Sequence, residues 1–198
     1  MYSSLLRFAQ RLFVAAGLVM LAYAGGTVAY AGMYQRYQSW KFQQEIAEPK
    51  ASRAGLAEEA ADLQQGDLVG RLDIPRIGIS VMVLHGIEER TLVAGAGHVP
   101  GTPLPGAQGN AVLAAHRDTF FRKLEGITSG DSIQVATVRQ THEYIVDSTE
   151  IVDPGNTQVM ESRDRQELTL ITCYPFYFAG AAPKRFIVHA RPAQVSKQ

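Results

Sequence analysis

The chain has 198 residues, of which 46% are hydrophobic, and lysine plus arginine equals aspartate plus glutamate at 19 each. This length has room for one ordinary domain plus additional segments, and the even charge balance does not indicate a nucleic-acid partner. A single cysteine, Cys173, excludes an internal disulfide and a Cys-x-x-Cys redox pair.

Residues 1–35 are predicted to form a short cytoplasmic tip and a transmembrane helix. No residue from Leu12 to Tyr34 carries a charge, and a helix over this run would extend about 35 Å, enough to cross a bilayer core. Arg7 and Arg11 precede the run, so the positive-inside tendency puts the N-terminus in the cytoplasm and the rest outside the plasma membrane. The alternatives are a buried core helix and a cleaved signal peptide, whose apolar region is usually shorter.

Residues 36–66 are rich in Gln, Glu, Ala and Lys and are interrupted by Pro49. They contain helix formers without a wide apolar face. This composition is typical either of a polar stalk that holds the next domain away from the membrane, or of a segment with no specific role.

From residue 67 to 192 the pattern changes to short alternating runs punctuated by Gly and Pro. Seven or eight short strands with one or two short helices predict a mostly β fold, a closed or nearly closed β-barrel. Residues 193–198 form a polar tail. A brief helix is expected near 88–93, and strands are expected over 68–74, 80–85, 111–115, 132–138, 143–152, 168–173 and 185–190.

Cys173 ends the run that begins at Leu168, and Pro175 follows two residues later. Proline cannot donate to a strand ladder, so the thiol is predicted at a strand end, where catalytic groups often lie. A cysteine in an apolar strand is more often a small core residue. An unpaired thiol in a domain expected to face an oxidising exterior nevertheless favours a nucleophile.

His116 also ends an apolar run, at a corner where Asp118 is predicted to cap a short helix. An imidazole beside a thiol can take up its proton and later protonate a leaving amine. The position at a strand end favours His116 over the other histidines. These alternatives are His85, His98, His142 and His189.

Arg185 opens the last predicted strand, twelve residues after Cys173. Consecutive strands joined by a short loop often lie side by side, which would bring the guanidinium near the thiol. Its permanently charged fork of donors would stabilise an oxyanion. The alternative is an arginine in a surface salt bridge.

Together these residues resemble the sortase family of cysteine transpeptidases. The run Thr169-Leu170-Ile171-Thr172-Cys173 matches the family signature Thr-Leu-x-Thr-Cys, with Arg185 downstream and His116 upstream. The resemblance covers residues 67–192, and several separated motifs in order are more specific than one match. The segments that look most like class D are 97–102, 109–110, 116–121 and 173–176.

The resemblance implies a closed eight-stranded barrel and cleavage of a Leu-Pro-x-Thr-(Gly/Ala) sorting signal after threonine, through a thioacyl-enzyme. Cys173 would attack, His116 would transfer protons, Arg185 would stabilise the oxyanion, and Thr172 is a candidate substrate-binding residue. The partners would be surface proteins with a C-terminal sorting signal, the membrane, and an amine acceptor such as a peptidoglycan precursor.

No cofactor or metal is expected. Residues 99–109 contain no acidic side chain, so the calcium site of the family's calcium-responsive members is not predicted. The histidines also lack metal-ligand spacing, which disfavours a metal module. An L,D-transpeptidase is disfavoured because Ile171 and Thr172 stand where that family has serine and glycine. The remaining alternative is a membrane-anchored barrel that binds sorting signals or wall polymer without catalysis.

Overall fold

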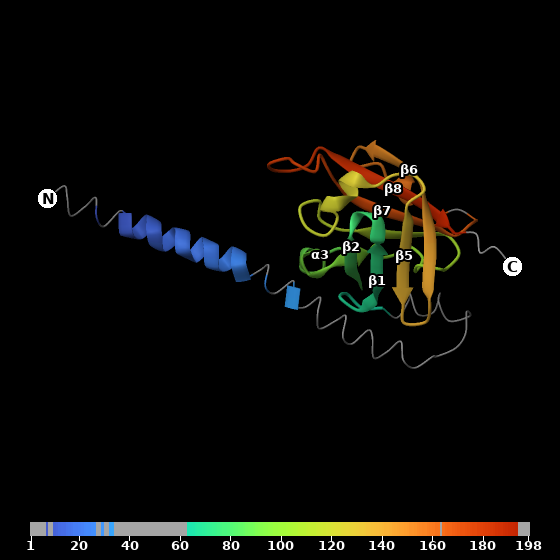
Figure 1. Cartoon of the computed structure of the whole chain (residues 1–198), viewed down its shortest axis with the longest axis horizontal. Helices are drawn as coiled ribbons and strands as arrows, with labels where there is room; N and C mark the ends of the chain where they lie inside the picture. Colours follow the sequence, from blue (N-terminus) through green and yellow to red (C-terminus); the bar gives the residue numbers. More distant parts are fainter. Residues whose placement is uncertain are drawn as a thin grey trace.

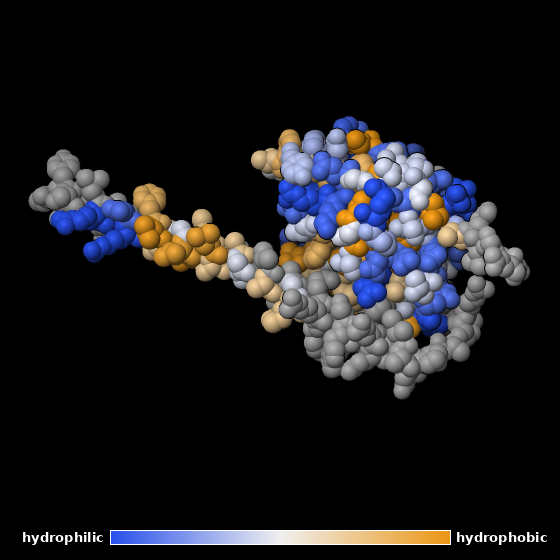
Figure 2. Space-filling model, viewed as in Figure 1, coloured by the Kyte–Doolittle hydropathy of each residue, from blue (hydrophilic) through white to orange (hydrophobic). Residues whose placement is uncertain are grey.

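The structure is a computed structural model. Its helix over residues 10–26 (Figure 1) exposes apolar side chains (Figure 2). Among the residues that the structure describes, no helix is both long and apolar enough to cross a membrane. The predicted span, stalk and tail extend into residues outside this set, so they stay predictions. The described residues are Arg7, 10–26, Ala29, Gly32, Met33, 63–162 and 164–193.

The remainder of the described chain consists of short strands and a few helical turns (Figure 1). The helical elements are η2 (Pro75–Ile77), α3 (Glu89–Ala94), η3 (Arg122–Gly126) and η4 (Gln158–Met160). The strands are β1 (Leu68–Ile74), β2 (Ile79–His85), β3 (Ala96–His98), β4 (Asn110–Ala114), β5 (Ser132–Thr137), β6 (Thr141–Val152), β7 (Glu167–Tyr174) and β8 (Lys184–Pro192).

The eight strands close into a barrel in the order β1-β2-β3-β4-β7-β8-β6-β5. The pairs β2–β3 and β4–β7 are parallel, and the other neighbouring pairs are antiparallel. Closure leaves no unpaired sheet edge. The closed mostly β fold expected from the sequence is therefore confirmed, and β4 and β7 become neighbours although β5 and β6 separate them along the chain.

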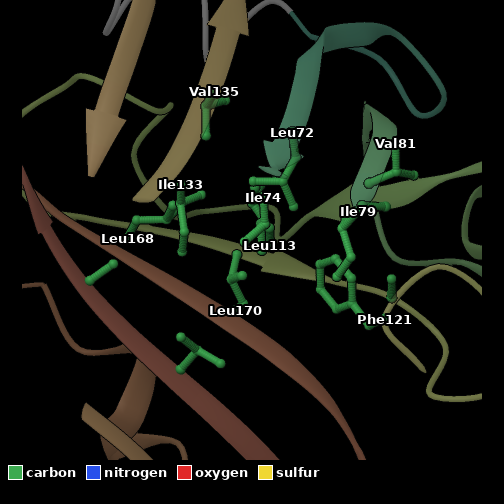
Figure 3. Close-up of a cluster of buried hydrophobic side chains, with 14 of the residues drawn as sticks. Leu72, Ile74, Ile79, Val81, Leu113, Phe121, Ile133, Val135, Leu168 and Leu170 are labelled. Carbon is green, nitrogen blue, oxygen red and sulfur yellow. The ribbon is translucent and has the colours of Figure 1, made fainter. Parts of the chain in front are cut away.

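Alternating apolar side chains fill the interior of the barrel (Figure 3). Leu72 and Ile74 point inward from β1, and Leu168 and Leu170 point inward from β7, all fully buried. Each such burial stabilises the fold by about 1.5–3 kcal/mol. The same period of two fixes which residues of β7 and β8 face outward.

All seven strands expected from the sequence are present, with ends within two residues of the prediction. The strand that was not predicted, β3, contains only Ala96, Gly97 and His98, which is too short to show alternation. A Cβ atom at Gly97 would collide with the carbonyl oxygen of Gly86, so glycine allows β3 to approach the end of β2 closely.

The prediction that Asp118 caps a short helix is wrong. Residues 117–120 form a turn, closed by a hydrogen bond from the Phe121 amide to the His116 carbonyl at 3.1 Å. Helix η3 begins only at Arg122, after Phe121. Phe121 and Leu124 are fully buried, so burial of these two side chains, rather than a capping carboxylate, decides where the helical turn forms.

Candidate active site

Cys173 and Arg185 lie directly opposite each other on neighbouring strands. Strands β7 and β8 pair antiparallel, and their register places Cys173 across from Arg185. Residues directly opposite in such a pair point to the same face, with Cβ atoms about 4.5–5.5 Å apart. The expectation that the two strands lie side by side is therefore confirmed.

The thiol lies on the outer face of the barrel. Leu168 and Leu170 point into the core (Figure 3), and Thr172 continues this inward-facing row at 2% exposure. Since successive side chains of a strand alternate between faces, Cys173 points outward, and it is free and half-buried. It is therefore not a core residue, and its side chain faces the outside of the barrel.

His116 follows strand β4 and lies beside the strand that carries the thiol. Strands β4 and β7 run parallel, with Ala114 opposite Ile171. The pairing continues past β4, because the Ala115 amide donates to the Ile171 carbonyl at 3.2 Å. Extended by two residues from the Ala114–Ile171 pair, this register puts His116 level with Cys173. Three adjacent strands therefore carry the imidazole, the thiol and the guanidinium to one end of the barrel.

The imidazole has an acidic neighbour that was not recognised in the sequence. The Nε2 atom of His116 lies 3.7 Å from Glu89 Oε1, and the two side chains are 31% and 81% exposed. Glu89 opens α3, a helix predicted without any functional role. An exposed contact of this kind contributes little to stability. No local sequence signal connects residues 89 and 116, because the contact depends on the barrel topology.

The guanidinium of Arg185 is held by the backbone of its own hairpin. Its Nη1 donates to the carbonyl oxygens of Lys184 at 3.0 Å and Ala182 at 3.4 Å. Neither acceptor is charged, so these bonds leave the positive charge available to a negative group on the outer face.

The comparisons with known proteins agree with this geometry. The family model described as the sortase domain matches residues 72–193. The chain belongs to the sortase family. Sortases are cysteine transpeptidases, and a thiol, an imidazole and a guanidinium at one end of the barrel are the groups that such chemistry needs.

Two curated sortases are similar over most of this sequence. Sortase D of Bacillus subtilis (strain 168) is 31% identical over 186 residues, which cover 90% of this chain and 94% of the relative. Sortase A of Bacillus anthracis is 28% identical over 177 residues, covering 78% and 84%. The solved structure of a Clostridium perfringens Sortase D5 transpeptidase shares the fold, with a TM-score of 0.68 at 22% identity, covering 83% of this chain and 99% of that one.

Thr172, the candidate substrate-binding residue of this sortase, has a buried hydroxyl. Its Oγ1 donates to the Ala115 carbonyl oxygen at 2.8 Å. The bond joins the strand that carries Cys173 to the segment that carries His116. This geometry favours a role in holding the two strands together over contact with substrate, and the substrate-binding role stays a prediction.

The other histidines of the sortase barrel lie away from the thiol. His85 and His98 form a pair, with their Nδ1 atoms 3.1 Å apart, and burial lowers the pKa of His98. His189 contacts Glu150 at 2.8 Å. His142 lies in β6 opposite Val135. Of the five histidines, His116 is the one whose position in the register brings it level with Cys173.

Proposed function

We propose that this sortase uses Cys173 as the nucleophile, His116 as the proton-transfer group and Arg185 as the stabiliser of the oxyanion. The observation that supports the assignment is the pairing of Cys173 with Arg185 across β7 and β8, with the strand that leads to His116 on the other side of β7. All three residues lie at the same end of the barrel, on its outer face.

The geometry supports a two-step acyl transfer. The Cys173 thiolate attacks the carbonyl carbon of the scissile bond, and Arg185 stabilises the oxyanion that forms. When the C–N bond breaks, His116 donates a proton to the leaving amine, and a thioester remains on Cys173. An incoming amine then attacks the thioester and gives its proton to His116. Collapse of the second intermediate forms the new amide and releases the Cys173 thiolate.

The proposed substrate is a protein with a C-terminal Leu-Pro-x-Thr-(Gly/Ala) sorting signal, cleaved after the threonine. The proposed acceptor is an amine such as that of a peptidoglycan precursor. Similarity to Sortase D of Bacillus subtilis over 90% of the chain supports a place in class D. No cofactor enters these steps, because every proton and bond change is assigned to the three side chains and the two substrates.

The proposed location is the plasma membrane, with a single span and the barrel outside. This proposal rests on the uncharged run from Leu12 to Tyr34 and on the exposed apolar side chains of the helix over residues 10–26. An exposed apolar helix surface is favourable in lipid and unfavourable in water.

The test uses the full-length chain in detergent micelles with a library of Leu-Pro-x-Thr-Gly and Leu-Pro-x-Thr-Ala peptides and an added amine. Mass spectrometry should detect cleavage after threonine, an acyl adduct on Cys173 and the amine transfer product. Cys173→Ala serves as the control, and it should remain folded but form neither adduct nor product.

Turnover by Cys173→Ala would overturn the assigned nucleophile. Peptide binding by the folded wild-type chain without any adduct would instead favour the barrel that binds sorting signals without catalysis.

A further inference from the structure

Arg117, the residue directly after His116, reaches across to the hairpin that directly follows Cys173. Its Nη1 donates to the Pro175 carbonyl oxygen at 3.0 Å. Its Nη2 donates to the carbonyl oxygens of Phe178 at 2.7 Å and Gly180 at 3.0 Å. One side chain therefore gathers three backbone carbonyls of the connection between β7 and β8.

The tip of the hairpin is exposed to solvent. Residues 177–181 are exposed, with Tyr177 at 66% and Phe178 at 47%. Segments with few buried apolar contacts open at low free-energy cost unless hydrogen bonds restrain them. The Arg117 guanidinium also lies 5.7 Å from the centre of the Phe178 ring, which adds a cation–π contact.

These bonds place His116 between two anchored neighbours. On one side, the Ala115 carbonyl accepts from Thr172, the residue before Cys173. On the other side, Arg117 donates to Pro175, two residues after Cys173. The imidazole and the thiol are thus linked on both flanks by short hydrogen bonds, although neither residue makes those bonds itself.

An arginine is suited to this task because its planar fork presents five donors in fixed directions. A lysine at the same position would keep the charge but would present one flexible ammonium group. It could not hold three carbonyls at spaced positions along the hairpin in the same geometry.

We propose that Arg117 is a positioning residue that fixes His116 relative to Cys173 by clamping the hairpin between β7 and β8 to the segment that carries His116. The inference rests on the proposed catalytic roles of these two residues. Arg117 touches neither the thiol nor the substrate in this scheme, and it acts through the backbone on either side of the two reacting groups.

Two measurements on the full-length chain in detergent test the inference. The first is kcat and KM for cleavage of a Leu-Pro-x-Thr-Gly peptide by wild type, Arg117→Ala and Arg117→Lys. The second is the rate of Cys173 alkylation by iodoacetamide as a function of pH, which needs no sorting signal. The matched control is Arg122→Ala, which removes an arginine that lies 4.7 Å from the Tyr177 ring on the same hairpin.

Both Arg117 variants should lower kcat by about tenfold to a hundredfold with less than about a threefold change in KM, because misplacing a catalytic group by about 1 Å can cost a hundredfold in rate. The rate of Cys173 alkylation should fall in both variants, since a displaced His116 no longer takes up the thiol proton. Arg122→Ala should stay within about twofold of wild type.

Wild-type rates in Arg117→Lys would overturn the inference, because charge alone would then suffice. A lower melting temperature with unchanged kcat and unchanged alkylation would also overturn it, because the role would be structural only. Equal losses in Arg122→Ala would show a general loosening of the hairpin and contradict the clamp. If the wild type cleaves no peptide, the proposed function fails, and the alkylation profiles alone decide the role of Arg117.

Discussion

Two arginines hold the segment between β4 and β5, one at each end. At the first end, Arg117 donates to the neutral carbonyls of the exposed hairpin that follows Cys173. At the other end, Arg76 of η2 forms a bidentate pair with Asp131, in which Nε donates to Oδ1 and Nη2 donates to Oδ2. The same Nη2 also donates to the Gly126 carbonyl oxygen at 2.6 Å. At both ends an arginine side chain donates several hydrogen bonds, but the acceptors differ in charge and burial.

The difference separates two kinds of restraint. Asp131 is 5% exposed and also accepts from the Thr128 amide at 2.8 Å. The hydrogen bonds from Arg76 hold the pKa of Asp131 below its usual value. This end is tied to the core by a charged pair, whereas the first end arranges half-exposed reactive groups. We therefore expect changes at the active-site end to lower turnover and changes at the Asp131 end to lower stability.

The largest expected effect is at Arg185. Arg185→Ala should lower kcat by about a hundredfold or more, because removal of one oxyanion donor costs about 10²–10³ in rate. Arg185→Lys should lose much of the rate as well, since the fork geometry is lost while the charge remains. Melting temperatures should barely change, because a partly exposed side chain contributes about 0.5 kcal/mol or less. Steady-state kinetics and thermal melting test this, and full activity in the lysine variant would contradict the oxyanion role.

Asp131→Asn should have the opposite profile. Loss of the charged acceptor at a buried site should lower the free energy of unfolding by about 2 kcal/mol, with kcat of the folded enzyme unchanged. The matched control is Asp73→Asn, which breaks the Arg71–Asp73 pair. Its carboxylate is 22% exposed against 5% for Asp131, so its loss should cost less than about 0.5 kcal/mol. Denaturant unfolding measures both free energies. A fully folded Asp131→Asn variant with lower turnover would contradict the proposed difference between the two ends.

The effect of Asp131 has a defined pH dependence. Because its folded-state pKa lies below the ordinary value of 3.8, the stability it contributes is complete above the unfolded pKa. It is lost as the pH falls through the lower folded-state value. The difference in stability between wild type and Asp131→Asn should therefore shrink below about pH 4. A difference that stays constant to pH 2 would contradict the charged pair.

Several features of the fold could be predicted because they are local. Alternating or continuous apolar residues mark each strand longer than four residues, whereas β3 has only three and could not be predicted. The start of η3 could not be predicted from Asp118, because burial of Phe121 and Leu124 decides it. Local pattern thus locates the strand ends that carry Cys173, His116 and Arg185.

The arrangement of the site depends on pairings that no local pattern contains. The neighbours Cys173 and Arg185 could be expected from a short connection, but β5 and β6 intervene between β4 and β7. Only the closed barrel brings His116 level with the thiol. The acceptors of Arg117 and the contact of Glu89 with His116 follow from the same closure, so the groups that orient the site lay beyond sequence reasoning.

Thr172 tests the second link between the active-site strands. Thr172→Val removes the donor to the Ala115 carbonyl while keeping the shape, and should cost about 1 kcal/mol of stability. Unlike Asp131→Asn, it should also lower kcat, because Ala115 directly precedes His116. Thr172→Ser keeps the hydroxyl and should retain the rate. A valine variant that loses stability and keeps kcat would show that the bond serves the barrel alone.

The smallest expected effect on stability lies at the His85–His98 pair, which is outside the segment between β4 and β5. His98 Nε2 lies 3.0 Å from the Pro103 carbonyl oxygen, so this nitrogen must carry the proton. The neutral His98 ring then accepts at Nδ1, and His85 donates to it at 3.1 Å. A second proton on His98 would set two N–H groups against each other unless His85 changed its tautomer.

Burial lowers the pKa of His98, the bond to Pro103 opposes this shift, and a charge on His85 adds to it. A histidine with a lowered folded-state pKa contributes stability that is complete above its unfolded value of about 6.5 and is lost as the pH falls through the folded value. The melting temperature of wild type should therefore decrease between pH 7 and pH 5, and His98→Gln should reduce this slope. His189→Gln removes a half-buried histidine that contacts Glu150 instead of another histidine, and it is the control. Equal slopes in wild type and His98→Gln would contradict a lowered folded-state pKa of His98.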